Sequence, residues 1–193
     1  MIKPGEIQNK AREIGVRDQQ IEKDYILSWI LQGITQHEQL STTMVFKGGT
    51  VLKKVYFENY RFSEDLDFTL LDNDILNQQI FEWFAEVFEY IQDEANIPFE
   101  IIDPNSHRGR LEHEDAHLPD LSVEQVRINF YINYVGPLGG LGANKRVKVD
   151  ISRSEQYNLN LSCRTLSWII QISQHTNCSV THLEKSWSKN YAL

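Results

Sequence analysis

The sequence predicts an α+β fold in which helices flank a mixed β-sheet. Segments with a helical repeat of apolar residues alternate along the chain with short segments in which apolar and polar residues alternate. Glycine- and proline-containing segments separate them, as expected of turns. With 193 residues, 41% of them hydrophobic and 24% charged, the chain is long enough for one domain with a sizeable core. This order of elements predicts helices packed around a sheet.

The first part of the chain is expected to form two helices, a strand and a helical turn. A short helix is predicted over residues 6–14, ending near Gly15, and a longer amphipathic helix over residues 18–34. Residues 43–46 form an expected strand that leads into two glycines, and residues 50–57 an expected helical turn. The candidate core positions of the longer helix are Ile21, Tyr25, Leu27, Ile30 and Leu31.

A strand–helix–strand succession is expected next. Residues 65–71 form an acidic strand, residues 73–94 a strongly amphipathic helix and residues 99–102 a short strand. The predicted apolar face of that helix contains Ile75, Ile80, Phe84, Val87, Phe88 and Ile91.

The later part of the chain predicts a loop and a hairpin. Residues 103–120 are polar and typical of a loop, whereas residues 123–135 alternate as in a strand. Residues 136–142 hold four glycines and a proline, which indicates the hairpin connection to a returning strand over residues 145–152.

The segment from Phe46 to Phe68 carries the most specific chemical signal. Asp65 and Asp67 are spaced by one residue, so in a strand their carboxylates point to the same face. Such carboxylates repel each other, and Mg²⁺ is a natural partner because it favours carboxylates together with substrate phosphates. The Gly48-Gly49 turn can bring backbone N–H groups close to a phosphate. Each motif alone is typical of a turn or a solvated strand end, but their ordered combination indicates metal-dependent phosphoryl or nucleotidyl transfer.

These residues resemble the nucleotidyltransferase toxins of the abortive-infection AbiEii/AbiGii type, within the DNA polymerase β-like nucleotidyltransferase superfamily. The resemblance rests on Lys47-Gly48-Gly49-Thr50 and on the sequence RFSEDLDF at residues 61–68. It also includes IEKDYILSW at residues 21–29 and RVKVDI at residues 146–151, and extends from about residue 15 to residue 152.

The resemblance implies a nucleotidyltransferase (polymerase β-like) fold and a Mg²⁺-dependent enzyme that moves a nucleoside monophosphate from an NTP to an acceptor. It also implies an RNA acceptor such as tRNA, and a toxin role opposed by a cognate antitoxin protein. The expected nucleotide-binding residues are Lys47, Gly48, Gly49, Thr50, Ser63 and Lys148. The expected catalytic residues are Asp65, Asp67, Asp150 and Ser63, and the three aspartates are expected to hold two Mg²⁺ ions.

Two of these expectations have an alternative. Asp150 joins the other aspartates only if its strand pairs beside theirs; otherwise it is a surface acid on an edge strand. Lys148 shares the face of Asp150 if that strand is regular. Ser63 belongs to the active site by resemblance, where it hydrogen-bonds a phosphate or a catalytic carboxylate, but a serine here can equally cap the turn into the strand.

The net charge of −8, from 27 acidic and 19 basic residues, argues against a broad basic surface for non-specific nucleic-acid binding. Local clusters of basic residues remain near both motifs, where they bind phosphates or lie in solvent. One cluster contains Lys47, Lys53, Lys54 and Arg61, and the other Lys145, Arg146 and Lys148.

Other features exclude further classes of protein. Cys163 and Cys178 form no metal-binding pair and are expected to be free thiols. His113 and His117 are spaced for zinc on a helix, but Pro119 follows and the segment reads as a solvated loop. No apolar run of about 18 residues occurs, and the N-terminus does not resemble a signal peptide, so we expect a cytoplasmic protein with no membrane partner.

The chain is expected to divide into a catalytic core with N-terminal helices, residues 1–155, and an atypical tail, residues 156–193. Relatives continue with a Glu-Lys-Leu-x-Ala-Leu stretch and an Arg-Asp-x-x-Asp motif, which the tail lacks. We interpret the tail as truncated or frameshifted, or as a short variant with its own packing. The alternative functions are a catalytically inactive relative that retains nucleotide or antitoxin binding, and a metal-dependent nuclease.

Overall fold

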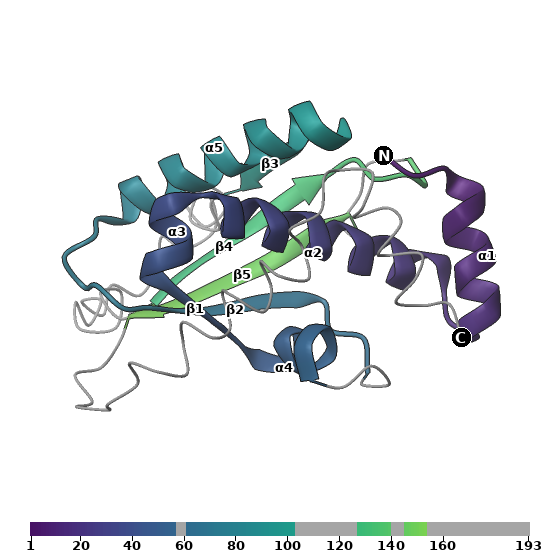
Figure 1. The fold of residues 1–193 in the computed structure, drawn as a ribbon, viewed down its shortest axis with the longest axis horizontal. Coiled ribbons are helices and arrows are strands. Elements are labelled where there is room, and N and C mark those ends of the chain that lie inside the picture. The colour runs from purple at the N-terminus through teal and green to yellow at the C-terminus, as the bar shows by residue number, and fades with distance from the viewer. Residues whose placement is uncertain (57–60, 103–126, 140–144, 154–193) are drawn as a thin grey trace, which may run out of the picture.

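The computed structural model describes residues 1–56, 61–102, 127–139 and 145–153. They form a five-stranded mixed sheet with helices packed against it (Figure 1). The strands are β1 (Met44–Lys47), β2 (Asp65–Leu70), β3 (Phe99–Ile102), β4 (Arg127–Tyr134) and β5 (Arg146–Arg153). The predicted α+β class with a mixed sheet is therefore confirmed.

The sheet has the strand order β1-β2-β5-β4-β3. Strands β2 and β5 run parallel, and every other neighbouring pair is antiparallel. The returning strand β5 thus lies directly beside the acidic strand β2, as the sequence predicts for a shared site. Strand β5 is central rather than an edge strand, because β4 pairs with its other side.

The helices are α1 (Pro4–Ile14), α2 (Asp18–Gln36), α3 (Glu38–Thr43), α4 (Gly48–Val51) and α5 (Asn77–Ala95), with a π-helix, η1 (Leu52–Tyr56), directly after α4. Helix α1 starts at Pro4, whose fixed φ suits the first helical position. It ends at Gly15, which has φ 76° and donates its N–H to the carbonyl of Ala11, a common way for a helix to terminate.

The core lies between the sheet and the helices α2 and α5. Alternate residues of β2, β4 and β5 are buried on one face, where the ring of Phe130 packs 5.2 Å from that of Phe84 in α5. Phe88 stacks on Phe99 at 4.9 Å. All five candidate core residues of the long helix are buried, as predicted: Ile21, Tyr25, Leu27, Ile30 and Leu31.

Several predicted boundaries differ from the structure by one to four residues. Residues 38–43 form helix α3, which was not predicted, so the strand begins at Met44 instead of residue 43. The helical turn begins at Gly48 rather than at residue 50. Helix α5 begins at Asn77 rather than residue 73, because the Asp72 carboxylate accepts from the N–H of Asp74 at 2.9 Å and holds a turn there.

Several predictions concern residues outside the described ranges. They include the loop over 103–120 with its histidines, the start of the strand predicted at 123, the glycines at 140 and 142, and the tail with Cys163 and Cys178. The division at residue 155 remains a prediction. Of the helices in the described part, none has the length and apolarity needed to cross a membrane.

Candidate active site

The sheet face opposite the core carries a row of polar side chains. Burial alternates along β2 and β5, so residues that flank the buried ones point to this opposite face. The acidic residues predicted from the sequence all lie on it. The face contains Asp65, Asp67 and Thr69 from β2, Lys148, Asp150 and Ser152 from β5, and Asn129 and Tyr131 from β4.

Strand register brings the predicted carboxylates together. Asp67 is the direct neighbour of Asp150 across the parallel pair, and Asp65 is the neighbour of Lys148. The Lys148 ammonium lies 2.7 Å from a carboxylate oxygen of Asp150. The two strands therefore place Asp67 and Asp150 side by side, with Asp65 one pleat away.

The electrostatics of this face show an excess of negative charge around Asp67. Burial raises the pKa of Asp67 above its ordinary value, and the neighbouring charges of Asp150 and Asp65 raise it further. Lys47 and Lys148 oppose this shift only in part. The hydrogen bond to Asp150 raises the pKa of Lys148. A cation bound among these carboxylates would relieve the repulsion.

The donor set suits a hard divalent cation in kind, since it consists of carboxylate oxygens. In the described residues, however, no three His, Cys, Asp or Glu side chains gather closely enough to enclose a metal ion. Mg²⁺ does not need such a cage, because it commonly binds one or two carboxylates and completes its shell with water and substrate phosphates. The Asp67–Asp150 pair, with Asp65 beside it, fits this mode of binding.

The glycine turn packs directly against these carboxylates. Gly48 has φ 79°, and a Cβ added to it would lie 2.9 Å from Cγ of Asp67, so no other residue fits without displacing that carboxylate. A Cβ on Gly49 would lie 3.2 Å from the Ser63 hydroxyl oxygen. The structure thus brings Ser63 to the turn, which is consistent with both of its predicted roles.

Thr50 and Lys47 attach the turn to the sheet. The Thr50 hydroxyl donates to the backbone carbonyl of Asp65 at 2.5 Å, so this side chain fixes the distance between the turn and the acidic strand. Lys47 is the cross-strand neighbour of Asp67, and its ammonium donates to the Ser152 hydroxyl at 2.6 Å. Both contacts hold the glycines over the carboxylates.

Two other basic residues near the turn have structural contacts. Lys54 forms an ion pair with the buried Asp24 at 2.7 Å. The Lys53 ammonium lies 4.0 Å from the centre of the Phe62 ring, and burial lowers its pKa. These lysines therefore stabilise the segment that follows the turn. From the sequence, they were expected either to bind phosphates or to lie in solvent.

Helix α2 holds the segments around the site through consecutive residues. Glu22, which is fully buried, forms an ion pair with Lys145 and accepts the backbone N–H of Leu138 at 2.8 Å. Lys23 pairs at 2.9 Å with Glu64, which precedes the acidic strand. Successive helical side chains point about 100° apart, so neighbouring positions contact different segments.

Asp24 continues this arrangement through its pair with Lys54. Residues 22–24 thus contact the β4–β5 connection, the start of β2 and the helix after the glycine turn. No role was predicted from the sequence for the two acids, Glu22 and Asp24. The available signal was the position of these two acids among the apolar residues of an amphipathic helix. An acid at such a position is buried and forms an ion pair.

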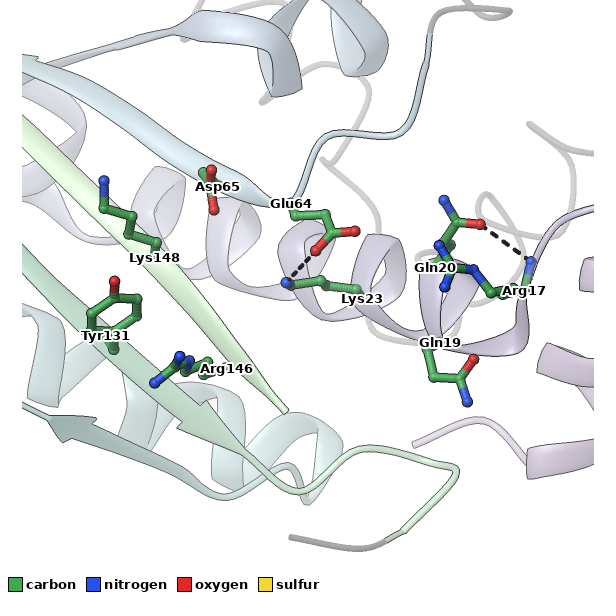
Figure 2. A pocket seen from close by; sticks show the side chains of 9 residues that line it. All are labelled: Arg17, Gln19, Gln20, Lys23, Glu64, Asp65, Tyr131, Arg146 and Lys148. Carbon is green, nitrogen blue, oxygen red and sulfur yellow. Dashed lines mark hydrogen bonds and ion pairs between the residues drawn. The ribbon is translucent and has the colours of Figure 1, made fainter. Parts of the chain in front are cut away.

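A cleft of about 680 Å³ opens beside Asp65 and Lys148, toward the N-terminal end of α2 (Figure 2). Its other described lining residues are Arg17, Gln19, Gln20, Lys23, Glu64, Tyr131 and Arg146. The Arg146 guanidinium carbon lies 4.7 Å from the centre of the Tyr131 ring. Neither Arg17 nor Tyr131 was predicted as a site residue, because Arg17 comes from the start of α2 and Tyr131 from β4, and only tertiary packing brings them to one cleft with Asp65.

A glycine turn packed on an acidic strand, with a third carboxylate on the parallel neighbour, is the arrangement that the resemblance to nucleotidyltransferases implied. The nucleotidyl transferase AbiEii toxin family of type IV toxin–antitoxin systems matches residues 29–175. The chain therefore belongs to this family, and the resemblance is confirmed.

Among solved structures, the chain is similar to MenT4, a nucleotidyltransferase toxin from Mycobacterium tuberculosis H37Rv, at 18% identity and a TM-score of 0.40. The alignment covers 86% of this chain and 51% of the MenT4 chain, so this chain spans about half the length of that protein. Comparison with curated proteins gives no match.

Proposed function

We propose that this chain transfers a nucleoside monophosphate from an NTP to an RNA acceptor such as tRNA, with Mg²⁺ as cofactor. Family membership supports a toxin that a cognate antitoxin protein opposes. The observation that carries the proposal is the packing of Gly48 against Asp67, with Asp150 on the neighbouring strand. This arrangement places the glycine turn next to a group of carboxylates.

In this proposal the turn binds the triphosphate. Backbone N–H groups of Gly48, Gly49 and Thr50 point to the phosphates, and Lys47 and Lys148 supply positive charge nearby. Ser63 lies against Gly49, within the same region, and contributes its hydroxyl. Fixed donors of this kind stabilise charge on the phosphates without reorganising during the reaction.

The carboxylates of Asp65, Asp67 and Asp150 would hold Mg²⁺. When bound, the metal supplies positive charge to the phosphates and activates the attacking group. Asp150 is oriented by its contact with Lys148 at 2.7 Å. The raised pKa of Asp67 has burial as its main cause, followed by the charge of Asp150, so cation binding should favour the ionised form of this side chain.

The test is a transfer assay with purified protein, Mg²⁺, total tRNA and each of the four NTPs labelled on the α-phosphate. We expect transfer of label to RNA with release of pyrophosphate, and loss of both in Asp65→Ala and after chelation. Asp93→Ala is the matched control, because Asp93 is exposed on α5. Full activity of Asp65→Ala, or RNA cleavage without pyrophosphate, would overturn the proposal.

A further inference from the structure

The cleft beside Asp65 has a charge that differs from that of the whole chain. Its described lining contains the cations Arg17, Lys23, Arg146 and Lys148 and the carboxylates Glu64 and Asp65, whereas the chain has a net charge of −8. Positive charge concentrated in a hollow of an acidic protein indicates an anionic ligand.

Two of these cations remain available to a ligand. Lys23 is paired with Glu64 and Lys148 with Asp150. Arg17 and Arg146 are exposed, and within the described ranges neither has a carboxylate at ion-pair distance. Guanidinium groups bind phosphate oxygens through paired hydrogen bonds, so both side chains suit phosphodiesters.

The cleft also offers a flat surface for a base. The Arg146 guanidinium lies 4.7 Å from the centre of the half-buried Tyr131 ring, and Figure 2 shows both side chains on the same wall as Lys148. Unstacked bases bind to aromatic rings and to guanidinium planes. This wall therefore suits a single-stranded nucleotide.

The position of the cleft distinguishes between the two substrates. Its described lining includes Asp65 from β2, Lys148 from β5 and Tyr131 from β4. The glycine turn follows β1, which pairs with the other side of β2, so the cleft and the turn lie on opposite sides of β2. In phosphoryl transfer the attacking and leaving oxygens lie roughly in line. With pyrophosphate at the turn, the attacking hydroxyl enters from the side of the cleft.

We infer that this cleft binds the single-stranded end of the acceptor polynucleotide, an inference that rests on the proposed function. Arg17 and Arg146 bind its phosphodiesters, and Tyr131 stacks with a base near the attacking hydroxyl. The nucleoside of the NTP fits this cleft less well, because it brings no phosphate beyond those at the turn. A polynucleotide brings one phosphate with every nucleotide.

Binding is tested first with a fluorescently labelled, short single-stranded RNA, by anisotropy at several salt concentrations. We expect Arg17→Ala and Arg146→Ala each to weaken binding and to lower the slope of log Kd against log salt by about 0.7. Tyr131→Leu should weaken RNA binding roughly 5- to 150-fold, whereas Tyr131→Phe should bind RNA about as tightly as the wild type, because the stacking ring remains. Arg12→Ala, an exposed arginine on α1, is the matched control.

The transfer assay with total tRNA then assigns the ligand. Variants of Arg17, Arg146 and Tyr131 should raise the KM for tRNA and leave the KM for the NTP unchanged. A raised KM for the NTP alone would overturn the inference and place the nucleoside in the cleft. Unchanged RNA binding and unchanged KM values would also overturn it. Absence of transfer by the wild type refutes the proposed function separately, since the anisotropy measurement still reports on the cleft.

Discussion

The buried ion pair between Glu22 and Lys145 allows a quantitative test of how α2 supports the site. The Glu22 side chain is 0% exposed and that of Lys145 13% exposed. Replacing Lys145 by methionine leaves the carboxylate buried with the N–H of Leu138, at 2.8 Å, as its remaining described partner. Breaking a buried pair in this way costs about 3–5 kcal/mol. Because Leu138 still donates, we expect a loss of about 3 kcal/mol.

The double variant Glu22→Gln/Lys145→Met separates the charge effect from packing. Glutamine keeps an acceptor for Leu138 and removes the buried charge, so most of the stability should return, to within about 1 kcal/mol of the wild type. The free energy of unfolding is measured by urea denaturation, with an unchanged m-value showing that the same surface unfolds.

An exposed lysine supplies the control for this experiment. Lys3 lies at the surface before α1, and Lys3→Met should change stability by less than about 0.5 kcal/mol. The reasoning is refuted if Lys145→Met costs less than about 1 kcal/mol. It is also refuted if the double variant is no more stable than the single one, because the loss would then come from packing rather than from an unpaired charge.

Three further predictions concern the turn and the core. Gly48→Ala should lower the free energy of unfolding by about 1–3 kcal/mol, because Gly48 has φ 79°, and should displace the Asp67 carboxylate. The control is Gly5→Ala, in open space on α1, which should not destabilise the protein in the same urea titration. The buried Tyr134 hydroxyl has no described hydrogen-bond partner, so Tyr134→Phe should raise stability by up to about 1 kcal/mol. Burial, then the charge of Glu22, raises the pKa of Tyr134, so the folded state holds this proton more tightly than the unfolded state. The wild type should therefore lose stability more steeply than Tyr134→Phe above about pH 10, and equal slopes in thermal melts would contradict this cause.

The sequence predicted the strands that carry the chemistry because their local signals were strong. The acidic strand and its return each combine alternating burial with charged residues on the other face, as in Asp65 and Asp150. Helix α3 was missed because the segment of residues 38–43 is short and mostly polar. The start of this helix also depends on a local contact, in which the His37 ring accepts a hydrogen bond from the Leu40 N–H at 3.3 Å.

The composition of the site was predictable only in part. Asp65, Asp67 and Gly48 lie close together in sequence, so their motif indicated the chemistry before the fold was known. The cleft combines Arg17 from the start of α2 with Tyr131 and Arg146 from β4 and β5. Residues separated by so much chain meet only through strand pairing and helix packing, which local patterns do not specify.

The sequence by itself determined most of the elements, the family resemblance and the identity of the acidic residues, because these follow from local periodicity and from motif spacing. The tertiary structure decided that β5 lies parallel to β2 with Asp150 beside Asp67. It also decided that Glu22, Lys23 and Asp24 contact three separate segments around the site. The physical reason is that register and ion-pair partners are set by packing between distant segments, where burying the shared apolar face selects one arrangement.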